Sequence, residues 1–136
     1  MNDMDMTPYE HLGGEAVLKE MVTNFYGFVK QDEVLAPLFP EDLTETARKQ
    51  TQFLTQFLGG PSLYTMEHGH PMLRARHMPF PITNRHAKAW LGCMEKAMDS
   101  VSLQGPLRDF IISRLTMTAY HMVNTSDDSH GKENNY

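Results

Sequence analysis

The segment of residues 67–82, EHGHPMLRARHMPFPI, contains three histidines within a short span of the chain. Imidazole nitrogens bind metals, so their spacing raises two kinds of metal site. A zinc site would use His68, His70 and His77 together and would need about four ligands. Only Glu67 lies nearby as a further ligand, and the single cysteine is distant, which disfavours zinc. Haem iron needs one protein histidine, which His77 could supply.

His77 ends a short predicted helix that begins at Pro71, and the stretch after it, MPFPI, is mostly apolar. A histidine in this setting is often a core residue bonded to the backbone, so this interpretation stays open beside that of a ligand. Haem would also need a flat apolar slot and cations for its two propionates. Arg74, Arg76 and Lys49 could supply the cations. The chain has no Cys-x-x-Cys-His motif, so the haem would be bound non-covalently.

Three hydrogen-bond donors lie on or beside apolar helix faces, where polar groups are costly unless they are partnered. They are the hydroxyl of Tyr26, the amide of Gln50 and the indole N–H of Trp90. Thr46 lies on the same helix face as Gln50, one turn earlier. Each donor could simply be bonded to a neighbouring backbone. If they converge, they form the polar end of an apolar pocket, which is typical of a small-ligand site.

Helical periodicity dominates the chain, and no segment has the alternation of a convincing strand. Gly13-Gly14 separates the first two predicted helices. We expect Asp42 to cap the third in a capping box with Glu45, and Asp32 to cap one further turn that ends at Pro37. The predicted elements are a short helix opened by Thr7-Pro8, helices from Glu15 to Lys30 and from about Asp42 to Leu58, a loop over 61–71, a short helix from Pro71 to His77, a helix capped by Thr83 or Asn84, and a last helix opened by Gly105-Pro106.

Length and composition predict one globular domain over residues 1–125, followed by a polar tail at 126–136 that we expect to be disordered. The net charge of −5 without a basic stripe argues against nucleic acid as a partner. No apolar run is long enough to span a bilayer, and the polar N-terminus does not resemble a signal peptide. Together with the single cysteine, this predicts a cytoplasmic protein with no internal disulfide and no membrane partner.

Several motifs, in order along the chain, resemble those of the bacterial group II truncated haemoglobins. The resemblance covers roughly Tyr9 to Val123 and implies a two-over-two helical sandwich around non-covalently bound haem b. The motifs are Gly13-Gly14, Phe25-Tyr26, Phe39-Pro40, Gly59-Gly60-Pro61, Arg76-His77-x-Pro79-Phe80 and Ala89-Trp90-Leu91.

The resemblance also implies roles for individual residues. His77 corresponds to the proximal ligand of the iron. Some members of the group have leucine where this chain has Gln50, so we expect a more polar distal pocket than theirs. Tyr26, Thr46, Gln50 and Trp90 fall at distal positions that face the gas, whereas Phe39, Lys49, Phe53, Tyr64 and Arg76 are expected to contact the cofactor.

These assignments predict reversible binding of O₂, and of CO and NO, with high affinity and slow release. Two alternatives stay open. One is a haem redox enzyme, acting as an NO dioxygenase with a reductase partner or as a weak peroxidase, although no distal histidine is evident for the latter. The other is a cofactor-free helical interaction domain, in which His77 and the three donors are ordinary core residues.

Overall fold

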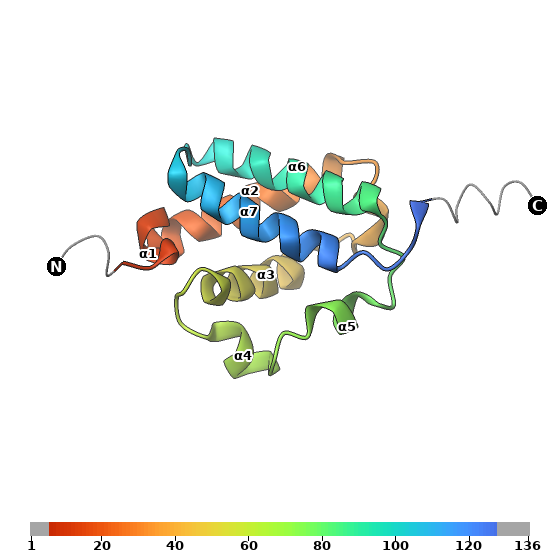
Figure 1. Cartoon of the computed structure of the whole chain (residues 1–136), viewed down its shortest axis with the longest axis horizontal. Coiled ribbons are helices and arrows are strands. Elements are labelled where there is room, and N and C mark those ends of the chain that lie inside the picture. The colour runs from red at the N-terminus through yellow and green to blue at the C-terminus, as the bar shows by residue number, and fades with distance from the viewer. Residues whose placement is uncertain (1–5, 128–136) are drawn as a thin grey trace, which may run out of the picture.

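The computed structural model describes residues 6–127, and within that range it is built of helices without a strand (Figure 1). The all-α prediction is therefore confirmed. The helices are α1 (Pro8–Leu12), α2 (Gly14–Gln31), α3 (Thr44–Phe57), α4 (Leu63–His68), α5 (Leu73–His77), α6 (Asn84–Ser100) and α7 (Pro106–His121), with a 3₁₀ turn, η2, at Ala36–Leu38.

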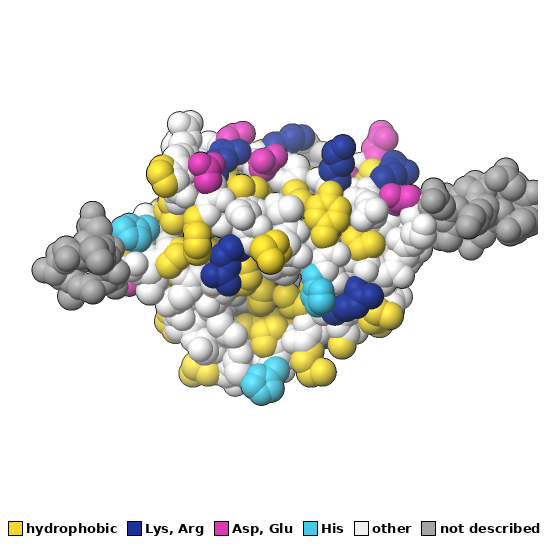
Figure 2. All heavy atoms as spheres, viewed as in Figure 1, with side chains coloured by type: hydrophobic (Ala, Val, Ile, Leu, Met, Phe, Trp, Pro, Cys, Tyr) yellow, Lys and Arg dark blue, Asp and Glu magenta, His cyan; other side chains and the backbone are white. Residues whose placement is uncertain are grey.

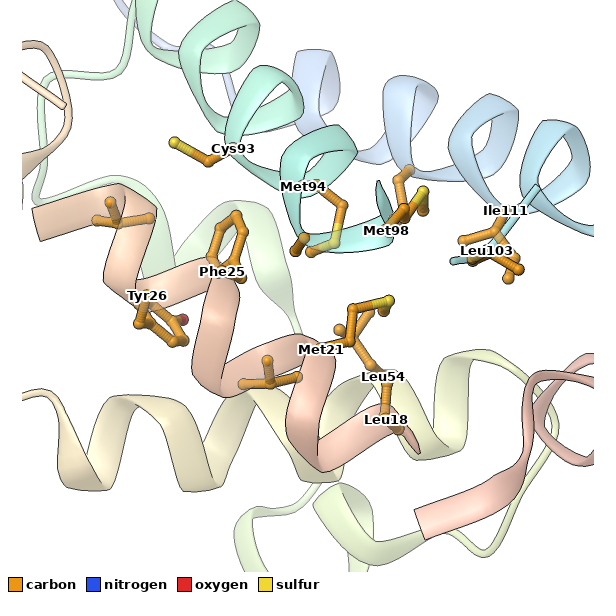
Figure 3. Close-up of a cluster of buried hydrophobic side chains, with 14 of the residues drawn as sticks. Leu18, Met21, Phe25, Tyr26, Leu54, Cys93, Met94, Met98, Leu103 and Ile111 are labelled. Atoms are coloured by element: carbon orange, nitrogen blue, oxygen red, sulfur yellow. The ribbon is translucent and has the colours of Figure 1, made fainter. Parts of the chain in front are cut away.

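Helix α2 is central, because it packs against both α3 and α6, while α7 packs on α6. The pair α2–α3 thus lies against the pair α6–α7. The core forms where the four helices meet, and each large side chain buried there contributes about 1.5–3 kcal/mol relative to exposure. Figure 3 shows the centre of this core, which includes Leu18, Met21, Phe25, Leu54, Met94, Met98 and Ile111.

The N-terminal corner follows the sequence signals closely. Thr7 and Glu10 form a capping box, with the Thr7 hydroxyl accepting from the Glu10 N–H at 3.1 Å and the Glu10 carboxylate accepting from the Thr7 N–H at 3.1 Å. The chain turns at Gly13, where φ is +122°. A Cβ at Gly13 would lie 2.5 Å from the Val17 side chain, so a larger residue would disrupt this turn.

Two predicted caps differ in detail from the structure. Asp42 accepts from the Thr44 N–H at 3.0 Å, but α3 begins at Thr44, and the Glu45 carboxylate bonds to Arg48 instead of completing a capping box. Asp32 does cap the next turn by accepting from two backbone N–H groups. Pro37 lies inside η2 and does not end it, because a proline is tolerated in the first turn of a helix.

The prediction of a loop over residues 61–71 is wrong, because α4 occupies Leu63–His68. Polar side chains from one stripe of α3 hold this short helix in place. Gln56 accepts from the Thr65 N–H at 2.9 Å and donates to its hydroxyl at 2.7 Å. Arg48 forms a two-pronged ion pair with Glu67 at 2.9 and 2.6 Å. A six-residue helix has little stability of its own, so α4 depends on these contacts.

Among the described residues, no helix is both long and apolar enough to cross a membrane. Of the tail predicted to be disordered, residues 128–136 lie outside the described residues.

Candidate functional site

A cavity of about 580 Å³ opens between α3, α5, α6 and α7. This volume is within the range of small-molecule sites, and the lining is mainly apolar. Figure 2 shows hydrophobic side chains gathered between α7 and the segments below it. The structure brings all ten residues predicted for the site to the lining of this one cavity, namely Tyr26, Phe39, Thr46, Lys49, Gln50, Phe53, Tyr64, Arg76, His77 and Trp90.

His77 is the last residue of α5, and its ring is half-buried in the cavity wall. Its Nδ1 lies 2.6 Å from the carbonyl oxygen of Leu73, one turn earlier. A carbonyl can only accept, so Nδ1 carries the proton and Nε2 is left with a bare lone pair. This is the tautomer that a metal-binding histidine needs, with the second nitrogen fixed by a backbone carbonyl.

Tyr26 projects from α2 toward α3, whereas its neighbour Phe25 projects toward α6 (Figure 3). Its ring is 6% exposed and packs edge-on against Phe25 and Phe39, with centroids 4.8 and 5.9 Å apart. Burial raises the pKa of the Tyr26 hydroxyl well above its ordinary value of 10. The hydroxyl therefore stays protonated at neutral pH and remains a donor.

Trp90 lies on α6 and packs against the ring of Phe25, which also contacts Tyr26. The centroids of the Trp90 and Phe25 rings are 5.1 Å apart. Within residues 6–127, neither the Trp90 indole N–H nor the Gln50 amide nor the Tyr26 hydroxyl has a hydrogen-bond partner. In the described part of the chain, every fully buried side-chain nitrogen or oxygen has a hydrogen-bond partner, so these three unpartnered groups are not fully buried. All three residues line the cavity, which is where their donors are accessible. The donors do not take the backbone partners that a plain core role would require.

Two cations line the cavity, Lys49 and Arg76. Lys49 is exposed and, in the described part of the chain, forms no hydrogen bond or ion pair. Arg76 lies over the ring of Tyr64 at 5.5 Å and is oriented by carbonyl oxygens of the α4–α5 connection, including that of Pro71 at 2.7 Å from Nε. Both cations could meet an anionic group at the cavity edge.

The suggestion that Arg74 supplies a cation to the site is wrong. Arg74 is not part of the cavity lining, and its Nη1 donates to the carbonyl oxygens of His121 and Val123 at 2.7 Å each. Arg74 and Arg76 are two residues apart on a helix, a spacing that places side chains on different faces. The guanidinium of Arg74 caps the C-terminal end of α7 instead.

The zinc alternative finds no support in the structure. Across residues 6–127, no group of three histidine, cysteine or acidic side chains is arranged to hold a metal. His68 lies in the segment predicted to be a loop, but it ends α4 and is largely covered. Its Nε2 is 2.8 Å from the Gln52 amide oxygen and 3.3 Å from the Glu67 carboxylate, which makes it part of the α3–α4 contact.

His86 lines the cavity without having been predicted there. It occupies the third position of α6, where its Nδ1 accepts from the N–H of the capping residue Thr83 at 2.9 Å. Burial, followed by the nearby charge of Arg85, lowers the pKa of His86. A capping-box pattern with histidine in place of glutamate was the available signal, but it points to a helix start and not to a cavity.

A small helical sandwich with an apolar cavity and a histidine whose Nε2 is free has the features of a haem-binding helical protein. Comparisons with known proteins show which family the chain belongs to. The family model of bacterial-like globins matches residues 7–124. The group 2 truncated haemoglobin YjbI of Bacillus subtilis is 62% identical over 120 residues, covering 88% of this chain and 90% of that protein.

Solved structures agree. The group II truncated haemoglobin of Bacillus anthracis superposes with a TM-score of 0.89 at 60% identity, covering 90% of this chain and 94% of that one. The truncated oxygen-avid haemoglobin of Bacillus subtilis gives 0.85 at 62% identity, covering 88% and 100%. The chain belongs to the bacterial-like globin family and, within it, to the group II truncated haemoglobins. The two-over-two fold expected from the resemblance is confirmed, and membership supports haem-based binding of diatomic gases in general.

Proposed function

We propose that this chain binds haem b non-covalently, with His77 as the axial protein ligand, and that it binds O₂, CO and NO reversibly. The observation that carries the proposal is the bare Nε2 of His77, which lines the same cavity as three unpartnered donors from three other helices. In a cofactor-free interaction domain these donors would be expected to bond to the backbone of a neighbouring helix, and within residues 6–127 none of them does.

The residues present fit the haem group in both shape and chemistry. The cavity lining is mainly apolar and aromatic, with Phe39 and Phe53 among the rings that would pack on the porphyrin. Lys49 and Arg76, with the hydroxyl of Tyr64, would meet the propionates at the edge. Bound haem would supply the iron that takes the gas, while the chain fixes the His77 ring through Leu73 and excludes water with its aromatic side chains.

The donors determine how tightly O₂ is held. O₂ held at the haem would carry partial negative charge, which the donors of the cavity would stabilise. Each such hydrogen bond is worth on the order of 1.5–3 kcal/mol. Two of them from Tyr26, Trp90 or Gln50 would slow O₂ release by roughly two to four decades. We therefore propose high affinity and slow release, and the similarity to a haemoglobin of Bacillus subtilis described as oxygen-avid supports this.

Haemin titration of the purified chain tests the proposal directly. We expect stoichiometric uptake with a sharp Soret band, and band shifts with O₂ and CO after reduction. His77→Ala should lose the histidine-ligated spectrum, because it removes the nitrogen proposed to bind the iron. His70→Ala is the matched control, since His70 is exposed and does not line the cavity. Absence of stoichiometric uptake by the wild type would overturn the haem proposal.

A further inference from the structure

Helix α5 carries the proposed iron ligand, but it is too short to fix the position of that ligand by its own hydrogen bonds. The helix has five residues, too few for intrinsic stability. The segment that follows, MPFPI, contains two prolines, which have no N–H to donate. The His77 carbonyl accepts from the Phe80 N–H at 3.0 Å, and its second lone pair can take a further donor from another part of the chain.

Asn124, just after α7, provides this further donor with its side-chain amide. Nδ2 donates to the carbonyl oxygen of His77 at 3.1 Å and to that of Phe80 at 2.8 Å. Oδ1 accepts from the N–H of Ile82 at 3.0 Å and from the hydroxyl of Thr125 at 2.7 Å. The two donors and two lone pairs of the amide are thus all in use, which fixes its orientation.

Arg74 makes the reciprocal connection, from α5 to the end of α7. Its Nη1 donates to the carbonyl oxygens of His121 and Val123, where a cation also complements the negative end of the helix. The backbone N–H groups of Asn124 and Thr125 both donate to the Ile82 carbonyl, at 2.9 and 3.0 Å. The ends of α5 and α7 therefore cap each other.

We infer that Asn124 is a positioning residue for His77, acting with Arg74 as a clamp between α5 and α7. Leu73 fixes the ring of His77 through Nδ1, and Asn124 fixes its main chain through the carbonyl, so the direction of Nε2 is set from two sides. This inference rests on the proposed role of His77 as the haem ligand. Asn124 itself does not line the cavity and would touch neither haem nor gas.

The substitution Asn124→Asp isolates the relevant bonds. It keeps the shape and the accepting oxygen, but it replaces the donors to His77 and Phe80 with a carboxylate oxygen that repels their carbonyls. Thr125→Val is the matched control, because it removes only the hydroxyl bond to Oδ1 and leaves both donors in place. Two measurements on the haem-loaded protein apply: the iron–histidine stretching band of the reduced form, and the rate of haem transfer to an acceptor apo-globin.

We expect Asn124→Asp to shift or broaden the iron–histidine band and to speed haem transfer by about tenfold, since the hydrogen bonds to the His77 and Phe80 carbonyls are lost. Thr125→Val should leave the band unchanged and the transfer rate within about twofold. Asn124→Ser, which retains one small donor, should fall between them and serves if Asn124→Asp does not fold.

The unfolding midpoint of the apo-protein separates positioning from plain stability. An unchanged band in the folded Asn124 variants would overturn the inference, even if apo-protein stability and haem retention both fell. A wild type that takes up no haem would overturn the proposed function and the positioning role with it. Normal His77-dependent uptake with an unchanged band in Asn124→Asp would overturn the positioning role alone.

Discussion

The part of the cavity lining that carries His77 differs from the parts that carry Tyr26, Gln50 and Trp90 in whether its polar groups have hydrogen-bond partners. On His77, Nδ1 is paired with the Leu73 carbonyl and the main-chain carbonyl with Asn124, and of the two ring nitrogens only Nε2 is left free. The three donors on the other elements have no partner in the described part of the chain. Pairing fixes geometry, whereas an unpaired donor in a dry pocket remains available to a ligand.

The difference shows how one small chain can combine a rigid ligand with a receptive pocket. Hydrogen bonds to other parts of the chain keep α5 in place, because a helix of five residues has little stability of its own. Tyr26 and Trp90 are instead positioned by aromatic packing, since Phe25 contacts both rings. Ring packing orients a side chain without using its hydrogen-bonding capacity.

Removing a cavity donor should have the largest effect on the gas. Trp90→Phe and Tyr26→Phe each delete one donor and keep an aromatic ring. We expect each to raise the O₂ dissociation rate by about ten- to a hundredfold, because each removes a charge-assisted hydrogen bond of about 1.5–3 kcal/mol. Stopped-flow measurement of O₂ release gives the rates.

CO is the control gas for these variants, because it carries less charge when bound and depends less on donors. Its dissociation rate should change far less than that of O₂. Equal changes for both gases would mean that the substitutions alter access to the cavity, and the contrast between paired and unpaired walls would lose its functional meaning.

Two glutamines on α3 sharpen the contrast within a single helix. Gln50 lines the cavity and is unpaired, whereas Gln52 lies outside it, donating to Glu67 at 3.0 Å and accepting from His68 at 2.8 Å. Gln50→Leu should also speed O₂ release by about ten- to a hundredfold, since it removes a donor of about 1.5–3 kcal/mol to the same bound gas. The matched variant Gln52→Leu should leave O₂ release unchanged and lower the unfolding midpoint. Similar O₂ kinetics in the two variants would exclude Gln50 as a donor to the gas.

Four of the cavity residues were predictable from the sequence pattern because each is a local anomaly among helices, whereas others, such as Phe39 and Tyr64, were indicated only by the family resemblance. Tyr26, Gln50 and Trp90 place polar atoms on or beside apolar faces, and His77 ends a short helix in apolar surroundings. The family resemblance then indicated that they share one site. Periodicity places a side chain on a face, and the face is what brings these residues to the cavity.

What could not be predicted depends on partners distant in the sequence. Asn124 bonds to residues 42 to 47 positions earlier, and nothing in its neighbourhood marks it as more than a polar residue after a helix. Helix α4 has no apolar period of its own and is held by side chains of α3. Arg74 was misplaced because its spacing from Arg76 shows that the two side chains lie on different faces of α5, but not which of these faces borders the cavity.

The smallest expected effect concerns the paired region outside the cavity, where α4 is held on α3. Hydrogen bonds from Arg48 and then Gln52 lower the pKa of Glu67 to about 2 from an ordinary value of 4.5. A carboxylate with a lowered pKa stabilises the folded state fully above its ordinary value, and this contribution is lost as the pH falls toward the lowered one. Glu67 is exposed, so the contribution is modest and screened by salt.

Glu67→Gln should therefore lower the thermal unfolding midpoint by a constant small amount from pH 7 to about pH 5. The difference from the wild type should shrink between about pH 4.5 and pH 2 as Glu67 itself becomes neutral. Glu95→Gln is the control, because Glu95 is exposed and its carboxylate forms no ion pair within residues 6–127. A Glu67→Gln deficit that persists undiminished at pH 2 would show that shape, and not charge, holds α4 on α3. In that case acid would not loosen α4, the helix that brings Tyr64 to the cavity, from α3.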